Sequence, residues 1–95
     1  MIMLMGKILT SEEVARGLEA LDSWEIVESE LIKVFKFSDY LEGIEFAGQC
    51  GKIAEEMNHH PDLLIQWRKV TVSISTHSAG GLTALDFDFA NKIEG

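Results

Sequence analysis

The sequence predicts an α+β domain of two layers, in which helices cover one face of a four-stranded antiparallel sheet. Two capping boxes and one long amphipathic stretch mark three helices, and two pairs of short β-prone runs mark four strands. The order along the chain is α-β-β-α-β-β-α, so each pair of strands is expected to form a hairpin. With 95 residues, the chain (1–95) is expected to be a single domain.

The first helix and the first hairpin are predicted in the amino-terminal part of the chain. Thr10 and Glu13 have the spacing of a capping box, and apolar residues follow at helical intervals, which predicts a helix over about residues 11–21. Two β-prone runs, residues 24–27 and 31–37, come next with three polar residues between them. They predict a hairpin.

A long second helix is predicted to begin after Ser38 or Asp39, since either side chain can act as its N-cap, and to end near Asn58. Apolar residues form a broad stripe along it. Pro61 is the only proline, and it biases His60 away from the α region. The helix is therefore expected to end at a pair of histidines.

Small residues recur at every fourth position on one face of this helix, at Gly43, Ala47 and Gly51. Each glycine costs about 0.8 to 1 kcal/mol of helix propensity relative to alanine. The stripe therefore indicates that another element packs closely against it. Packing on the chain's own sheet is favoured over a contact with another subunit.

The second hairpin is predicted from residues 63–67 and 70–77, and the latter run alternates apolar with polar side chains. Thr83 and Asp86 have the spacing of a second capping box, which opens a last helix to about residue 93. Along the chain, the two predicted hairpins thus alternate with the three predicted helices.

Composition and charge exclude several classes of function. The chain is 46% hydrophobic and 25% charged, which is typical of a soluble globular protein. Its formal charge of -8, with the basic residues scattered, argues against binding to DNA or RNA and against an anionic membrane surface. No run approaches the roughly 18 apolar residues that span a bilayer. The apolar start, residues 1–5, is expected to be a frayed terminus or an added strand.

A single cysteine, Cys50, has no partner for an intrachain disulfide, which fits a reducing cytoplasm. It lies among apolar residues and is interpreted as core rather than as a nucleophile. The small size of the domain and the strand over residues 31–37, apolar on both faces, favour a homo-oligomer, either a dimer or a tetramer. The sequence does not decide between the two.

Every histidine of the chain lies in one short region, together with acidic residues. The set is Glu55, His59, His60, His77 and Asp86. Imidazole exchanges protons near neutral pH, since its unperturbed pKa is about 6.5, so the region suggests proton-transfer chemistry. Glu55 precedes His59 by four residues and is expected on the same helical face, where it can orient that imidazole.

Each of these residues also has a purely structural interpretation. Adjacent histidines can simply finish a helix, and His77 can be a hydrogen-bonded residue at the end of a strand. Asp86 is explained by its capping box, and Glu55 can be a solvated side chain on an acidic helix. A metal site is disfavoured, because His59 and His60 are adjacent whereas helical metal pairs are three or four residues apart.

The complete pattern resembles the signature of the pterin-4a-carbinolamine dehydratases. It runs from Glu55 through His59-His60-Pro61 to Trp67, His77 and Asp86. The flanks are also similar to that family, notably Trp24 in Asp22-Ser23-Trp24, the stretch from Phe35 to Tyr40, and the stretch from Thr76 to Thr83. The resemblance covers nearly the whole chain and is weakest over the first nine residues.

The resemblance implies an enzyme, a carbon–oxygen lyase that dehydrates 4a-hydroxytetrahydrobiopterin to quinonoid dihydropterin and water without metal or cofactor. It implies acid and base roles for His59 and His60 jointly, binding and proton transfer by His77, and support by Glu55. The residues expected to hold the pterin are His59, His60, Pro61, Ser75, Thr76, His77, Trp24 and Asp86. For Trp24, a place in the core is the structural alternative.

A second function also fits the resemblance. Some members of the family act as dimerisation cofactors of a homeodomain transcription factor, so the chain can also be a noncatalytic pterin-binding or protein-interaction module. The sequence does not distinguish recycling of tetrahydrobiopterin for aromatic hydroxylases from another pterin or molybdenum-cofactor role.

Overall fold

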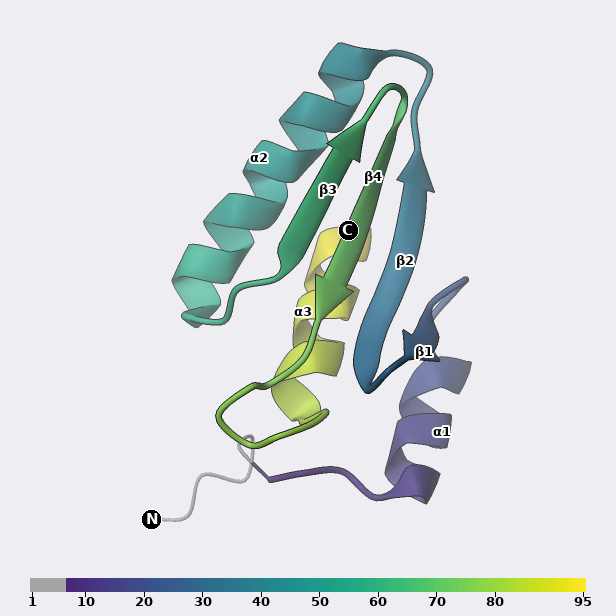
Figure 1. Cartoon of the computed structure of the whole chain (residues 1–95), viewed down its shortest axis with the longest axis vertical. Helices are drawn as coiled ribbons and strands as arrows, with labels where there is room; N and C mark the ends of the chain where they lie inside the picture. Colours follow the sequence, from purple (N-terminus) through teal and green to yellow (C-terminus); the bar gives the residue numbers. More distant parts are fainter. Residues whose placement is uncertain (1–6) are drawn as a thin grey trace.

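The computed structural model describes residues 7–95, so the apolar start of the chain lies outside the described residues. Three helices and four strands follow in the predicted order (Figure 1). The elements are α1 (Ser11–Glu19), β1 (Glu25–Val27), β2 (Glu30–Lys36), α2 (Tyr40–Met57), β3 (Asp62–Gln66), β4 (Lys69–Ile74) and α3 (Ala84–Glu94).

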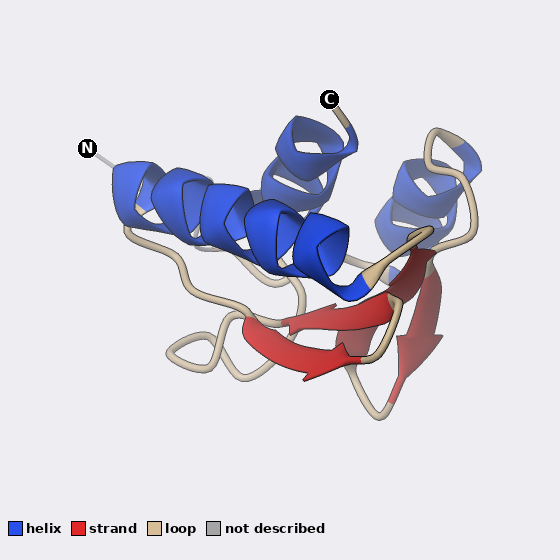
Figure 2. Cartoon of the chain, turned by 90° about the horizontal axis from the view of Figure 1, so that it is seen from above, coloured by secondary structure: helices blue, strands red, loops and turns tan. Residues whose placement is uncertain are grey.

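The four strands form one antiparallel sheet in the spatial order β1-β2-β4-β3, so that β4 and β2 lie at its centre. The three helices lie on the same side of the sheet (Figure 2). This arrangement confirms the predicted two-layer α+β fold, in which the amphipathic helices bury the apolar face of the sheet.

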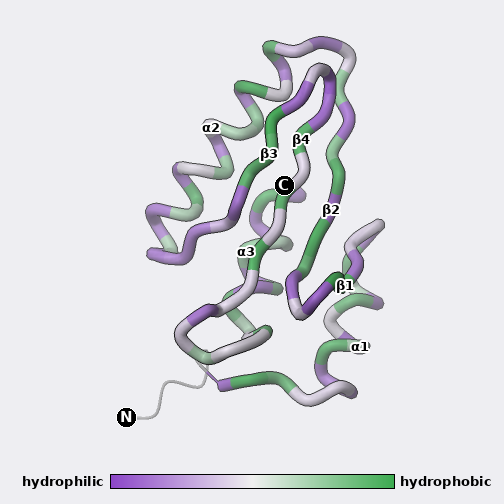
Figure 3. The backbone as a smooth tube through the Cα atoms, in the orientation of Figure 1, coloured by the Kyte–Doolittle hydropathy of each residue, from purple (hydrophilic) through white to green (hydrophobic). Residues whose placement is uncertain are grey.

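The core lies between the central strands and the helices. Leu31 on β2 is paired with Ile74 on β4, and both side chains are almost fully buried. Val70 and Val72 alternate with polar residues along β4 and face the same layer, as the strand period requires. Phe89 of α3 has no exposed surface. Figure 3 shows this alternation along β4 as green bands separated by pale ones.

Helix α2 has the predicted boundaries. The Asp39 side chain accepts a hydrogen bond from the backbone N–H of Glu42 at 2.9 Å, so Asp39 rather than Ser38 is the N-cap. Ser38 instead donates both its hydroxyl and its backbone N–H to the Glu42 carboxylate, and these hydrogen bonds lower the pKa of Glu42. Asn58 closes the helix in the left-handed conformation at φ 51°.

The stripe of small residues on α2 packs on the sheet over part of its length. A Cβ atom at Gly43 would lie 3.3 Å from a methyl group of Val70, and Ala47 is buried. At Gly51, by contrast, a Cβ atom would have no neighbour within 4 Å. Close packing on the chain's own sheet is thus confirmed at Gly43 and is wrong at Gly51.

Cys50 belongs to the core, as predicted, since only 1% of its surface is exposed. Burial raises the pKa of its thiol to about 11. The thiol therefore stays protonated at neutral pH and is a poor nucleophile.

Strand β4 is shorter than the predicted run over residues 70–77. It ends at Ile74, opposite Leu31, because β2 begins one residue before Leu31 and offers no further partner. Thr76 forms an isolated bridge with Gly81 instead, and His77 lies in the turn that this bridge closes. His77 is therefore a turn residue and not the end of a strand.

Within residues 7–95, no helix combines the length and the apolar character that crossing a membrane requires.

Candidate active site

The end of α2 directs one histidine into the protein. Because Asn58 adopts the left-handed conformation, the chain turns back and the backbone N–H of His59 bonds to the carbonyl of Ala54 at 3.0 Å. The imidazole then points toward α3, where its Nε2 lies 2.6 Å from Oδ1 of Asp86. Only 11% of the His59 side chain is exposed, so this pair is shielded from water.

Asp86 is fully buried and every oxygen of its carboxylate is occupied. Its Oδ2 accepts the backbone N–H of Thr83 at 2.8 Å and the hydroxyl of Thr76 at 2.9 Å. The first of these bonds belongs to the predicted capping box of α3. The capping interpretation is therefore confirmed, and the same carboxylate also holds His59.

His60 makes a different kind of pair. Its Nε2 lies 2.5 Å from Oε2 of Glu55, and the two side chains are 53% and 78% exposed. The prediction that Glu55 orients His59 is therefore wrong, because Glu55 pairs with His60. The spacing of four residues applies only within a continuous helix, and α2 ends at Met57, before His59.

His77 does not contact the pair of histidines. Within residues 7–95, no hydrogen bond joins its side chain to another residue, and the side chain is exposed. It lines a hollow of about 230 Å³ whose other residues are Glu28, Ser29, Glu30, Ser75, Gly80 and Gly81. The turn is nevertheless anchored next to the site, because Thr76 precedes His77 and its hydroxyl bonds to Asp86.

Both Ser75 and Thr76 were expected to bind the pterin, but their side chains lie in different surroundings. Ser75 lines the hollow beside His77. Thr76 is 95% buried, and its side chain is committed to Asp86 and Thr83. Pro61 is half-buried directly after the histidine pair and is joined by a trans peptide bond.

Trp24 lies in the core and not beside the histidines. It is 7% exposed, meets Phe35 edge to face with ring centres 5.9 Å apart, and donates its indole N–H to Glu94 at 2.6 Å. Glu94 ends α3, whereas Asp86 lies in its first turn. The structural alternative for Trp24 is thus the observed one, and the chain does not bring its ring to the site.

Trp67 is also remote from the histidine pair. It is 73% exposed in the turn between β3 and β4, while the histidines precede the opposite end of β3. The guanidinium carbon of Arg68 lies 5.2 Å from the centre of the Trp67 ring, in a cation–π contact.

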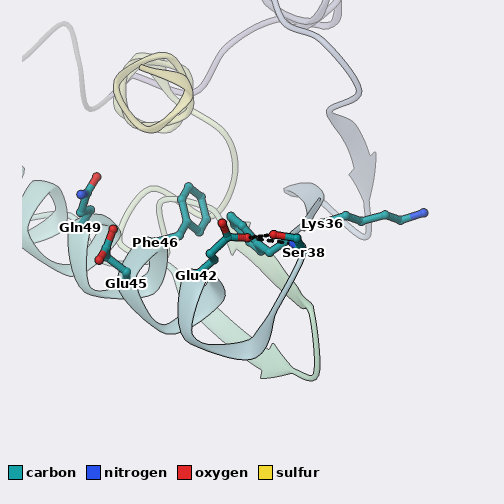
Figure 4. Close-up of a pocket in the computed structure, with 7 residues that line it drawn as sticks. Lys36, Ser38, Glu42, Glu45, Phe46 and Gln49 are labelled. Atoms are coloured by element: carbon teal, nitrogen blue, oxygen red, sulfur yellow. Dashed lines mark hydrogen bonds between the residues drawn. The ribbon is translucent and has the colours of Figure 1, made fainter.

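A separate hollow lies where β2 meets the first half of α2 (Figure 4). Its volume is about 470 Å³, and it is lined by Lys36, Phe37, Ser38, Glu42, Glu45, Phe46 and Gln49. None of its lining residues was among the predicted site residues, although Lys36, Phe37 and Ser38 belong to a stretch that resembles the family. It contains no histidine, and in it the Glu42 carboxylate already binds Ser38.

No three histidine, cysteine, aspartate or glutamate side chains among residues 7–95 are grouped closely enough to hold a metal ion. The arrangement at the end of α2 is instead two carboxylate–imidazole pairs on neighbouring residues, one buried and one exposed. Such pairs can accept and donate protons near neutral pH.

The sequence and the fold correspond to a known family. The family model described as pterin 4 alpha carbinolamine dehydratase matches residues 7–95, and the chain belongs to this family. A relative from Natronomonas pharaonis, named provisionally as a pterin-4-alpha-carbinolamine dehydratase, is 41% identical and covers 95% of this chain and 96% of its own. A relative from Sulfolobus acidocaldarius with the same name is 41% identical over 90% of this chain and 93% of its own.

Solved structures show the same fold. The crystal structure of a transcriptional coactivator/pterin dehydratase from Brucella melitensis is 34% identical, with a TM-score of 0.88 over 93% of this chain and 96% of that chain. A pterin dehydratase-like protein identified as a RuBisCO assembly factor in the alpha-carboxysome has a TM-score of 0.65 at 21% identity, over 77% of this chain and 87% of that chain. The latter likeness concerns the fold alone.

Proposed function

We propose that this chain catalyses the dehydration of 4a-hydroxytetrahydrobiopterin to quinonoid dihydropterin and water, as a step in the recycling of tetrahydrobiopterin. The observation that carries the proposal is the buried pair of His59 and Asp86 beside a second imidazole, His60. Membership of the pterin carbinolamine dehydratase family supplies the substrate class.

The reaction requires two proton transfers and no redox step. As the bond between C4a and the hydroxyl oxygen breaks, the oxygen needs a proton to leave as water, and a ring nitrogen of the pterin loses a proton. Positioned imidazoles can perform both transfers at neutral pH. We assign these roles to His59 and His60 jointly.

Binding of the pterin is proposed to involve the turn that carries His77. Thr76 fastens this turn to Asp86, and Ser75 and His77 line the same hollow beside it. Within the described residues the side chain of His77 makes no hydrogen bond, so it is available to a ligand. Its backbone follows Thr76, which bonds to Asp86 of the buried pair. Glu55 supports His60 rather than His59.

The test is dehydration by the purified protein as isolated and after exhaustive chelation. We expect the same rate in both, because the proposed proton transfers need only the imidazoles. Carbinolamine generated in situ by a phenylalanine hydroxylase is followed by its ultraviolet absorbance, with the uncatalysed rate subtracted. Activity that is lost with EDTA and restored by zinc would contradict the metal-free mechanism.

A protein-interaction role is the second candidate, and exposed apolar residues favour it. Leu41, Tyr40 and Ile44 on α2 are 74%, 47% and 38% exposed. The Brucella melitensis protein named above is described as a coactivator as well as a dehydratase. A folded protein that binds a pterin but gives no rate above the uncatalysed one would favour this candidate.

A homo-oligomer, dimer or tetramer, is proposed from the same kind of surface. Besides α2, the sheet face opposite the helices exposes Val27, Val34 and Leu64 at 42%, 44% and 56%. Val34 and Leu64 both pair with Thr71, one on each side of β4, and exposed apolar side chains that gather in this way commonly mark protein contacts. We expect light scattering at micromolar concentration to give a mass at least twice the 10.6 kDa of the chain, and a purely monomeric mass would contradict the expectation.

A further inference from the structure

The carboxylate that holds His59 is itself held by a chain of buried hydroxyl groups. The hydroxyl oxygens of Thr83 and Thr76 are 2.8 Å apart, and that of Thr76 is 2.9 Å from Oδ2 of Asp86. Thr83 and Asp86 are fully buried and Thr76 is 5% exposed. Water therefore does not compete for these hydrogen bonds.

The direction of each hydrogen bond follows from the count of protons. A hydroxyl has one proton to donate, and Thr76 donates its proton to Asp86. The Thr76 oxygen must then accept the proton of the Thr83 hydroxyl. The Thr83 oxygen in turn accepts the backbone N–H of Leu85 at 3.2 Å. Every proton of the chain thus points toward the carboxylate, and Oδ2 receives two donors.

This order fixes the protonation of the His59 ring. Because Oδ2 is filled by donors, the remaining oxygen, Oδ1, faces Nε2 of His59 at 2.6 Å with one proton between them. Imidazole is a stronger base than a carboxylate, so that proton belongs to Nε2. In the neutral ring the other nitrogen, Nδ1, then carries the lone pair.

Nδ1 of His59 is also the ring nitrogen that reaches the surface. Within residues 7–95, no hydrogen bond engages it, and no buried side-chain nitrogen or oxygen is left without a partner. An atom without a partner is therefore not a buried one. The ring thus has one nitrogen held in the interior and one open to a ligand.

We infer that the Thr83–Thr76–Asp86 chain holds His59 as the Nε2–H tautomer, so that Nδ1 is the atom that exchanges a proton with the substrate. Thr83, Thr76 and Asp86 are positioning residues, since they act through His59. The role of Nδ1 rests on the proposed function, whereas the tautomer is a property of the protein alone. His60 lacks such a chain, because Glu55 is exposed.

The tautomer is read directly from long-range ¹H–¹⁵N correlation spectra of the imidazole rings in ¹⁵N-labelled protein. We expect a protonated Nε2 and an unprotonated Nδ1 for His59. The Asp86→Asn variant is expected to reverse this tautomer. Thr83 and Thr76 keep the amide oxygen at the position of Oδ2, so the amide N–H group faces Nε2 and the proton must move to Nδ1. Turnover should fall by about 10²-fold, the low end of the effect of a positioned acid or base.

Thr83 also caps α3, so its role needs a control for lost helix stability. Thr10 forms the same kind of capping box on α1 and has no hydrogen bond to the site. Thr10→Val and Thr83→Val should both lower the melting temperature. Only Thr83→Val should shift the His59 ring signals and lower turnover severalfold, and Thr83→Ser should restore both. If the two valine variants had the same His59 ring signals and the same turnover, Thr83 would act only as the cap of α3.

Three outcomes separate the inference from the proposed function. A wild-type proton on Nδ1, or an unchanged tautomer in folded Asp86→Asn, would overturn the inference. Normal turnover of Asp86→Asn with the tautomer switched would overturn the role of Nδ1. A wild-type protein with the Nε2–H tautomer and no dehydration would contradict the proposed function and leave the tautomer supported.

Discussion

Replacing His59 with alanine is expected to lower the rate of dehydration by about 10²- to 10⁴-fold, because a positioned acid or base contributes that much to proton transfer. This corresponds to roughly 3 to 5 kcal/mol in the activation free energy. The uncatalysed reaction sets a floor under the measured rate, so the observed loss can be smaller. The measurement is kcat for each variant after subtraction of that floor.

Loss of stability must be separated from loss of proton transfer in this variant. Removing the imidazole leaves Oδ1 of the buried Asp86 without its partner, which costs about 1 to 3 kcal/mol in the free energy of unfolding. His59→Gln is the matched variant, since its amide can still donate to Asp86 but does not titrate. We expect Gln to regain stability and to remain as slow as Ala.

The other two histidines complete this test. His60→Ala is expected to lower turnover without unfolding the protein, because its pair with Glu55 is exposed and contributes little to stability. The double change with His59→Ala should be less than additive, since the two rings can partly substitute for each other. His77→Ala should also weaken substrate binding. Near-normal turnover of all three folded variants would make the interaction role the better interpretation.

The sequence predicted the order of elements because the signals for them are local. Thr10 and Thr83 both cap their helices through the predicted boxes, and Asp39 opens α2. The predicted end of β4 was wrong because it depends on where β2 begins, more than forty residues earlier. A strand's length is set by its partner, and periodicity within the strand carries no information about that partner.

The same limit applies to the site. The residues of the pattern were found by spacing, but their partners were not. His59 bonds to Asp86, 27 residues away, and this contact exists only because Asn58 turns the chain toward α3. Once the turn is made, His60 rather than His59 reaches back to Glu55. Side-chain pairing across a helix end is a tertiary property that helical spacing does not predict.

Trp24 illustrates why an aromatic residue is ambiguous in sequence. A tryptophan that stacks on a ligand and one that fills a core are the same residue type, and both can stand in a β-prone run of sequence. The deciding contacts are with Phe35 and Glu94, which the fold brings together from β2 and the end of α3. For Thr76, likewise, only the structure shows that its hydroxyl faces Asp86 and not the hollow beside Ser75.

Replacing Phe89 with alanine is expected to lower the free energy of unfolding by about 3 to 5 kcal/mol, since the ring is fully buried in the core and its removal leaves a cavity. A small domain has a total stability of about 5 to 15 kcal/mol, so the loss is a large fraction of it. Trp67→Ala is the matched control, because it removes a larger ring that is 73% exposed, and we expect a change within about 0.5 kcal/mol. Urea titrations at one protein concentration measure both, which keeps any contribution of subunit association constant. Similar losses for the two variants would mean that the surface at Trp67 is buried in the folded assembly, and a loss below about 1 kcal/mol for Phe89→Ala would contradict the place of α3 in the core.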